Sequence, residues 1–94
     1  MRDYVHEHFA KHPRDKDSWP RARPAIVCRD GYSYSVQASV FTYCSPREDN
    51  APRYTAVEVW GIRRNGLWHG REPEGWVPVE TVNRRIRRHG GVAD

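Results

Sequence analysis

The sequence predicts a single α+β domain: an N-terminal helix, an antiparallel sheet of about three strands, and a C-terminal helix packed on one face. Three observations predict this class. Apolar residues recur at helical spacing over residues 3–12, alternate with polar residues after an Asp-Gly turn at residues 30–31, and return to helical spacing after Pro78. The 94 residues leave no room for a second core, so one domain spans 1–94.

The first element is an amphipathic helix within residues 1–12, with Asp3 as a candidate N-cap and Pro13 as its end. One face of this helix carries Tyr4, Val5, His8, Phe9 and His12. Residues 13–24 contain three prolines, six charged residues and one tryptophan. We therefore expect an extended connector there, anchored by Trp19.

A hairpin follows the connector, within the sheet-forming segment 25–94. Residues 25–28 are apolar and rich in β-branched side chains, and Asp30-Gly31 supplies the turn because glycine adopts positive φ at little cost. The returning strand alternates. Tyr34, Val36, Ala38 and Val40 fall on an apolar face, and Ser33, Ser35, Gln37 and Ser39 on a polar face that we expect to point outward.

The second half predicts one more strand and one more helix. Residues 44–52 are polar and proline-punctuated, hence a loop, and residues 54–62 fit a strand. We interpret residues 63–76 as a long ordered loop that could include a short strand at Leu67-Trp68.

The C-terminal helix has the clearest signals. Pro78 suits its first turn, Glu80 favours its positive end, and Gly90-Gly91 can close it. Its apolar stripe is formed by Val79, Val82 and Ile86.

Composition narrows the class of partner. The formal net charge is +4, and fourteen of the sixteen basic residues are arginines, which disfavours an acidic mimic of DNA. No secretory signal is evident, and no apolar run approaches the ~20 residues of a membrane span. Two cysteines without CxxC spacing predict a reduced, cytoplasmic setting.

Two surfaces are candidates for binding a partner. Four arginines in the C-terminal helix could contact phosphates or an acidic protein patch, or could serve only the helix dipole and solvation. The polar strand face and the segment after it could contact a protein, or could be an ordinary outward sheet face. The candidate partner-binding residues are Ser35, Gln37, Ser39, Tyr43, Arg47, Arg84, Arg85, Arg87 and Arg88.

Aromatic and basic residues interleave around the predicted loop 63–76. Single-stranded nucleic acid stacks on such a pattern, which gives an alternative binding set of Arg63, Arg64, Trp68 and Arg71. The competing interpretation, which we favour, makes Trp60, Trp68 and Trp76 core anchors of a small domain.

The sequence predicts no catalytic residue, metal or cofactor. His8 and His12 are spaced i, i+4, but no further ligand lies at metal-like spacing and both fall on the packing face. Cys44 could act as a nucleophile only if His69 or His89 came within hydrogen-bond reach. A disulfide between Cys28 and Cys44 is disfavoured.

The segments 30–39 (DGYSYSVQAS) and 43–47 (YCSPR), with VPVE at 77–80 and HGG at 89–91, resemble a pattern of small phage and prophage proteins. The resemblance covers residues 25–91 in outline and assigns no role to any residue. It implies a mobile-element origin and an accessory factor that binds and inhibits a host macromolecule, such as a CRISPR–Cas or other antiviral complex. A small basic nucleic-acid-binding protein is the alternative, and a homodimer stays open.

Overall fold

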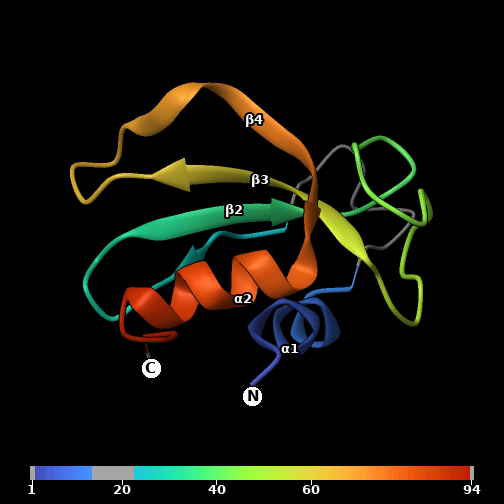
Figure 1. Cartoon of the computed structure of the whole chain (residues 1–94), viewed down its shortest axis with the longest axis horizontal. Coiled ribbons are helices and arrows are strands. Elements are labelled where there is room, and N and C mark those ends of the chain that lie inside the picture. The colour runs from blue at the N-terminus through green and yellow to red at the C-terminus, as the bar shows by residue number, and fades with distance from the viewer. Residues whose placement is uncertain (1, 14–22, 94) are drawn as a thin grey trace.

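The computed structural model describes residues 2–13 and 23–93. Its elements are α1 (Tyr4–Lys11), β1 (Ile26–Val27), β2 (Ser33–Gln37), β3 (Ala56–Ile62), β4 (Trp68–Pro78) and α2 (Val79–Arg88) (Figure 1). The predicted α+β class is confirmed, with four strands where about three were expected. Most of the predicted connector, Trp19 included, lies outside the described residues. Neither described helix is long and apolar enough to cross a membrane.

The strands form one antiparallel sheet in the order β1-β2-β3-β4. The predicted turn at Asp30-Gly31 joins β1 to β2. Gly31 has a φ of +92°, and the Asp30 carboxylate accepts a hydrogen bond of 3.0 Å from the backbone N–H of Tyr32. The register pairs Ser35 of β2 with Trp60 of β3, so these two side chains share a face of the sheet.

The expectation of a loop over residues 63–76 is wrong, because most of that segment is strand β4. Two glycines, two prolines and three charged residues give β4 little strand propensity of its own. Pairing with β3 stabilises it, with register shifts between Val57 and Val59 and between Val59 and Gly61. The first strand residues pair at one end of β3 and the last at the other, and β4 bows away between them (Figure 1).

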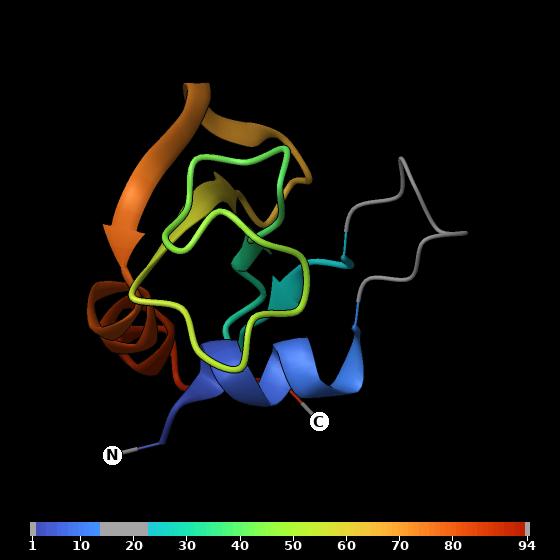
Figure 2. The same cartoon turned by 90° about the vertical axis from the view of Figure 1, so that its right-hand side faces the viewer.

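Both helices cover the same face of the sheet, and the segment between β2 and β3 folds over one end of it (Figure 2). The covered face carries the alternate apolar residues Tyr34, Val36, Val57 and Val59. Val40, expected to extend this face, lies beyond the end of β2 and is exposed.

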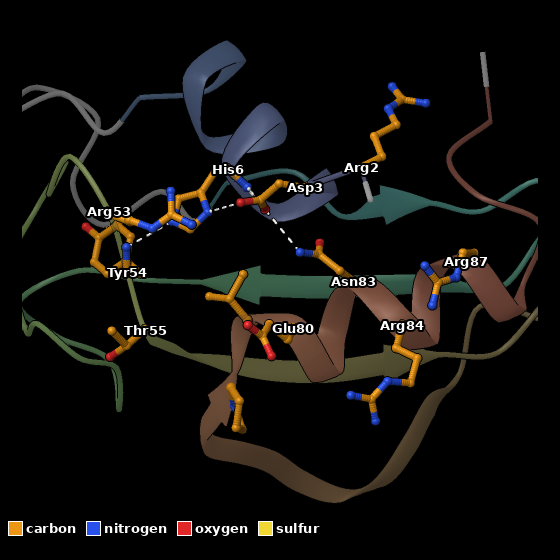
Figure 3. A pocket seen from close by; sticks show the side chains of 12 residues that line it. Arg2, Asp3, His6, Arg53, Tyr54, Thr55, Glu80, Asn83, Arg84 and Arg87 are labelled. Atoms are coloured by element: carbon orange, nitrogen blue, oxygen red, sulfur yellow. Dashed lines mark hydrogen bonds and ion pairs between the residues drawn. The ribbon is translucent and has the colours of Figure 1, made fainter.

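Hydrogen bonds attach α1 to α2 and to the start of β3 (Figure 3). Asp3 caps α1 as predicted, since its carboxylate accepts from the backbone N–H of His6 at 3.1 Å. The Asn83 amide donates to that carboxylate and accepts from the backbone N–H of Val5, each at 3.1 Å. His6 Nε2 accepts from the backbone N–H of Tyr54 at 2.9 Å, so Nδ1 carries the ring proton and donates to Asp3 at 2.7 Å.

These contacts set the charge state of Asp3. Burial raises the pKa of its carboxyl, but the hydrogen bonds from His6 and Asn83 outweigh that effect and hold the pKa below its ordinary value. The carboxylate is therefore ionised and fully engaged where α1 meets α2.

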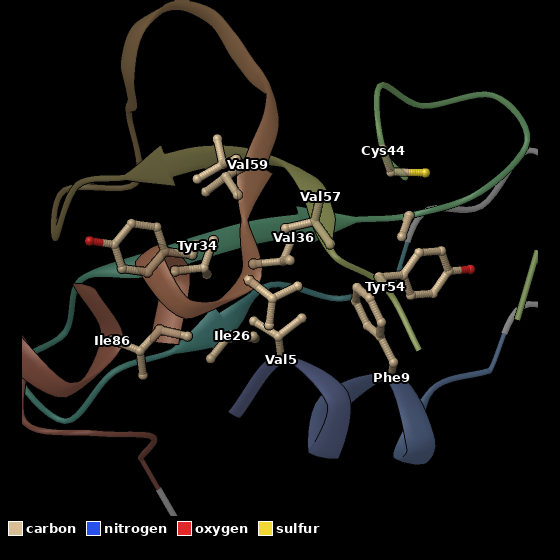
Figure 4. Packing of buried hydrophobic residues seen from close by; sticks show 14 of the residues in the cluster. Val5, Phe9, Ile26, Tyr34, Val36, Cys44, Tyr54, Val57, Val59 and Ile86 are labelled. Carbon is tan, nitrogen blue, oxygen red and sulfur yellow. The ribbon is translucent and has the colours of Figure 1, made fainter. Parts of the chain in front are cut away.

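The core lies between the helices and the sheet (Figure 4). It is built from medium-sized side chains, and no tryptophan of residues 23–93 belongs to it. Its members include Val5, Phe9, Ile26, Tyr34, Val36, Cys44, Tyr54, Val57, Val59, Val82 and Ile86. Each fully buried aliphatic side chain of this kind contributes about 1.5–3 kcal/mol.

Arg23 is buried, with only 6% of its surface exposed. Its Nε donates to the backbone oxygen of His12 at 2.8 Å and its Nη1 to that of Ala38 at 2.7 Å. Its Nη2 donates to the Asn50 side chain at 3.3 Å, and the guanidinium lies 4.2 Å from the centre of the Phe9 ring. One side chain therefore connects the end of α1, the end of β2 and the loop before β3.

The end of α2 follows the predicted glycine pattern. Gly90 and Gly91 have φ of +91° and +83°. The N–H of Gly90 bonds to the oxygen of Arg87 and that of Gly91 to the oxygen of Ile86, each at 3.0 Å, which is a Schellman motif.

The chain then runs antiparallel to β1. Arg29 N donates to the oxygen of Gly91 at 3.0 Å, and Ala93 N donates to that of Val27 at 2.8 Å. Cys28 and Val92 form an antiparallel bridge between these two bonds.

Replacing Arg23 by lysine tests its role in the fold. An ammonium keeps the charge but cannot donate in the planar fork that reaches His12, Ala38 and Asn50 together. We expect the free energy of unfolding, measured by urea denaturation, to fall by at least about 2 kcal/mol, because buried backbone acceptors lose their donors. Arg63→Lys, at an exposed turn, is the matched control and should change it little. Equal stability of the two variants would contradict this role.

The free energy of unfolding depends on pH partly through Asp30. The hydrogen bond from His89 Nδ1 at 2.6 Å, and then the N–H of Tyr32, hold the pKa of Asp30 below its ordinary 3.8, with Arg64 at 3.6 Å adding to the effect. Because its pKa is lower in the folded state, the ionised Asp30 carboxylate stabilises the fold. The full contribution is present above pH 3.8 and is lost as the pH falls through the folded-state pKa.

We therefore expect Asp30→Asn to flatten the acid limb of the stability curve below about pH 4. Thermal unfolding followed by circular dichroism between pH 2 and 7 measures this. Asp49→Asn, in an exposed loop, serves as the comparison. An acid limb for Asp30→Asn that is as steep as that of the parent protein would show that Asp30 does not contribute.

Candidate binding surface

The face of the sheet opposite the helices is the candidate binding surface. By strand alternation it carries Ser33 and Ser35 of β2 and Glu58, Trp60 and Ile62 of β3. Neither described helix covers this face, because both pack on the other side.

Two aromatic pairs lie on this open face. Trp60 and Trp68 are stacked with ring centroids 4.2 Å apart. Tyr43 and Trp76 are tilted with centroids 4.8 Å apart, and Tyr43 is fixed to the open face because its backbone N–H donates to Glu58 at 3.0 Å. We call the residues Tyr43, Trp60, Trp68 and Trp76 the aromatic surface.

The aromatic surface is largely open to solvent: 49% of Trp68, 59% of Trp76 and 51% of Tyr43 is exposed. The interpretation of Trp68 and Trp76 as core anchors is therefore wrong. The core is filled by valines, isoleucines and Tyr54, which leaves the tryptophans outside it. Phe41 and Leu67, also exposed, add apolar area near the two pairs in sequence.

Backbone contacts hold the Tyr43–Trp76 pair in place. Trp76 has a φ of +50° and its N–H donates to the oxygen of Tyr43 at 2.9 Å. A β-carbon added at Gly75 would lie 2.8 Å from Cβ of Tyr43, so only glycine permits this approach. The Arg47 guanidinium lies 5.7 Å from the Tyr43 ring centre, which brings these two predicted binding residues together.

Trp60 has a polar atom without a partner. Its indole N–H is buried and meets no acceptor among the described residues. A buried donor left unsatisfied costs about 1–3 kcal/mol. Because the nitrogen is not accessible at the surface, this cost belongs to the fold itself.

The predicted polar strand face is only partly available. Ser35 lies on the open face as expected. Gln37 is buried beneath the backbone of Arg23. Its side-chain oxygen accepts from the Arg23 N–H at 3.0 Å, and its side-chain nitrogen donates to the Arg23 oxygen at 2.9 Å. Ser39 is 1% exposed and lies beyond β2, where its Oγ accepts from the N–H of Phe41. Gln37 therefore lies on the expected face of β2 but is covered, and Ser39 lies outside the strand, so the expectation that both are open to a partner is wrong.

The four arginines of α2 do not form one face. Arg85 donates to Glu74 of β4 at 2.6 Å, whereas Arg84 and Arg87 border a groove on the side of α1. Arg88 is exposed. Because α2 covers the inner face of the sheet, these arginines lie on the opposite side of the sheet from Tyr43 and Arg47. One compact contact therefore cannot include both predicted sets.

The alternative nucleic-acid set is also divided. Arg64 lies 3.6 Å from Asp30, near the β1–β2 turn. Arg63 and Arg71 are exposed, in the β3–β4 turn and in β4, near Trp68 in sequence. Trp68 is stacked on Trp60 with the ring planes inclined by 29°, and 49% of Trp68 is exposed.

The cysteines and histidines considered from the sequence do not come together. Both cysteines are free and buried, and burial with a smaller effect of Asp30 raises the pKa of Cys28 to about 11. The Cys44 thiol contacts the backbone oxygens of Ser39 and Pro46 rather than His69 or His89. The His8 and His12 rings are 4.7 Å apart, and within residues 2–13 and 23–93 no third metal ligand joins them.

A cavity of about 420 Å³ lies beneath the bow of β4. Tyr32 and His69 meet there, with Oη and Nδ1 2.8 Å apart, and Arg85 pairs with Glu74. Burial raises the pKa of Tyr32, and it raises that of Tyr34 to about 12, so both hydroxyls stay protonated at neutral pH. These groups already bind one another, and they support β4 from beneath.

Comparisons with protein-family models, with curated proteins and with solved structures each found no match.

Substituting Gly75 by alanine tests the geometry of the aromatic surface. The added methyl group would overlap Tyr43, so we expect the Tyr43–Trp76 pair to separate and the protein to lose about 1–3 kcal/mol of stability. Tryptophan emission and near-ultraviolet circular dichroism report the pair. Glu72→Ala, an exposed position on the same strand, is the control. Unchanged spectra in Gly75→Ala would contradict the predicted overlap.

Proposed function

We propose that this chain is a non-catalytic accessory protein of a phage or mobile element that binds a host macromolecule and inhibits it, with an antiviral complex of the CRISPR–Cas type as the expected class of target. The target is expected in the host cytoplasm. The observation that carries the binding proposal is the aromatic surface on the uncovered face of the sheet. The phage origin and the class of target rest on the sequence resemblance alone.

Exposed aromatic side chains of this kind are typical of protein interfaces. Tryptophan, tyrosine and arginine dominate the energetics of interfaces, and Tyr43 contacts both Trp76 and Arg47 here. Hydrogen bonds to Glu58 and between Trp76 and Tyr43 fix the backbone that carries this pair, so little backbone entropy is lost when a partner binds.

This assignment changes the expected contact residues. It retains Tyr43, Arg47 and Ser35, adds Trp60, Trp68 and Trp76, and leaves out Gln37 and Ser39 because they are buried. The α2 arginines lie on the other face and are outside the proposed contact.

Trp76→Ala should weaken binding to a target protein, first captured from host lysate and then purified, by about thirtyfold in calorimetric titration, as expected for a hot-spot residue. Arg88→Gln on the helical face is the control and should bind as the parent does. If Arg88→Gln weakens binding and Trp76→Ala does not, the contact lies on the helices and the proposal of the open face fails.

Nucleic-acid binding is the second candidate, favoured by the exposed ring of Trp68 between Arg63 and Arg71 in sequence. Under the protein-binding proposal, fluorescence anisotropy with single- and double-stranded DNA and RNA should show no tight complex at about 50 or 200 mM salt. Tight binding that drops steeply between those conditions, and that Trp68→Ala abolishes, would favour the nucleic-acid function. A homodimer is a further alternative, which sedimentation velocity distinguishes.

A further inference from the structure

We propose that the groove between α1, α2 and the segment before β3 binds a small organic molecule through its phosphate or diphosphate group. The groove has a volume of about 540 Å³, which falls within the range of small-ligand sites. It lies on the helical side of the molecule and is independent of the aromatic surface (Figure 3).

Four arginines from separate parts of the chain border this groove: Arg2, Arg53, Arg84 and Arg87. Two acidic residues, Asp3 and Glu80, also line it, so the lining carries an excess of two positive charges when His6 is neutral. Guanidinium groups match the oxygens of phosphate and carboxylate with paired N–H donors, and the larger charge and extra oxygens of a phosphate suit a site bordered by several of them.

The acidic lining residues differ in what they can do. The Asp3 carboxylate is occupied by two hydrogen bonds from His6 and one from Asn83, so it is directed into the protein. Glu80 is exposed at the first turn of α2 and has no partner among the described residues. Glu80 is therefore the acidic group that would repel an anion in the groove.

Two of the arginines are available to a ligand. Arg53 and Arg84 are exposed and form no hydrogen bond or ion pair through their side chains with residues 2–13 or 23–93. Arg2 already pairs with Glu7 at 3.0 Å and would act mainly through its charge. Arg53 precedes β3 and Arg84 belongs to α2, so the groove has an available guanidinium group on each of two elements.

The walls of the groove are fixed before any ligand binds. Asn83 attaches α2 to Val5 of α1, and His6 attaches α1 to the backbone of Tyr54, next to Arg53. Tyr54 and Val79, which are buried, supply apolar lining. Fixed walls reduce the entropy lost on binding, and the apolar lining suits the organic part of a phosphorylated molecule.

The test is calorimetric titration of the full chain with pyrophosphate, with ADP, and with an oligonucleotide that lacks terminal phosphates, in a phosphate- and sulfate-free buffer. We expect saturable binding of pyrophosphate and ADP. Arg53→Gln and Arg84→Gln should each weaken it about tenfold, the loss expected for one charged hydrogen-bonding partner. Glu80→Gln should strengthen it, because the substitution removes the repelling charge.

Arg88→Gln is the matched control: it lies in the same helix, is equally exposed, and is absent from the groove. Because all four substituted positions are exposed, unfolding midpoints should stay the same in every variant. Equal weakening by Arg88→Gln and Arg84→Gln would mean unspecific charge attraction and would overturn the site. Binding of the oligonucleotide alone would overturn the small-molecule source, and absence of all binding would overturn the proposal. None of these outcomes bears on Trp76, so the proposed function is judged separately.

Discussion

The buried guanidinium of Arg23 is the contact on which the arrangement of the other parts depends. It donates to the residue that ends α1, to the residue that follows β2 and to the loop before β3. A cation in this position is costly unless all of its donors find acceptors. Because the acceptors belong to three different segments, the guanidinium can form all of these hydrogen bonds only when all three segments are in their folded positions. The interaction therefore specifies the arrangement more than it adds to stability.

With that end of the molecule fixed, the sheet divides the chain into two surfaces of different chemistry. The helical side contains the hydrocarbon core and, around its rim, arginines that border a polar groove. The other side has no described helix over it and carries exposed aromatic rings. These rings lie outside the core because valines and isoleucines fill most of the interior. A small domain can thus separate two kinds of recognition across a single layer of strands.

Local sequence patterns predict much of this fold. The hairpin at Asp30-Gly31, the cap at Asp3 and the glycine end of α2 depend on neighbours in sequence, and all three are confirmed. The sequence did not predict β4, because residues 69–75 have low strand propensity and the strand is stabilised by its irregular pairing with β3. Similarly, alternation placed Gln37 on the outer face correctly but could not show that the Arg23 backbone covers it. The sequence showed the tryptophans of the candidate surface but not whether they are buried. Trp68 and Trp76 are exposed because residues far apart in sequence fill the core without them.

The short stretch after α2 has a consequence for how copies of this chain could associate. Residues 91–93 pair with β1, so that margin of the sheet is already occupied by the protein's own backbone. Strand β4 is last in the strand order at the opposite margin, and the N–H of its Trp76 is bonded to the oxygen of Tyr43. An unpaired strand margin is a template on which another chain can add a strand. The contacts of residues 91–93 with β1 and of Tyr43 with β4 reduce the number of unpaired backbone groups near both margins, which disfavours edge-to-edge association of a small protein with exposed tryptophans.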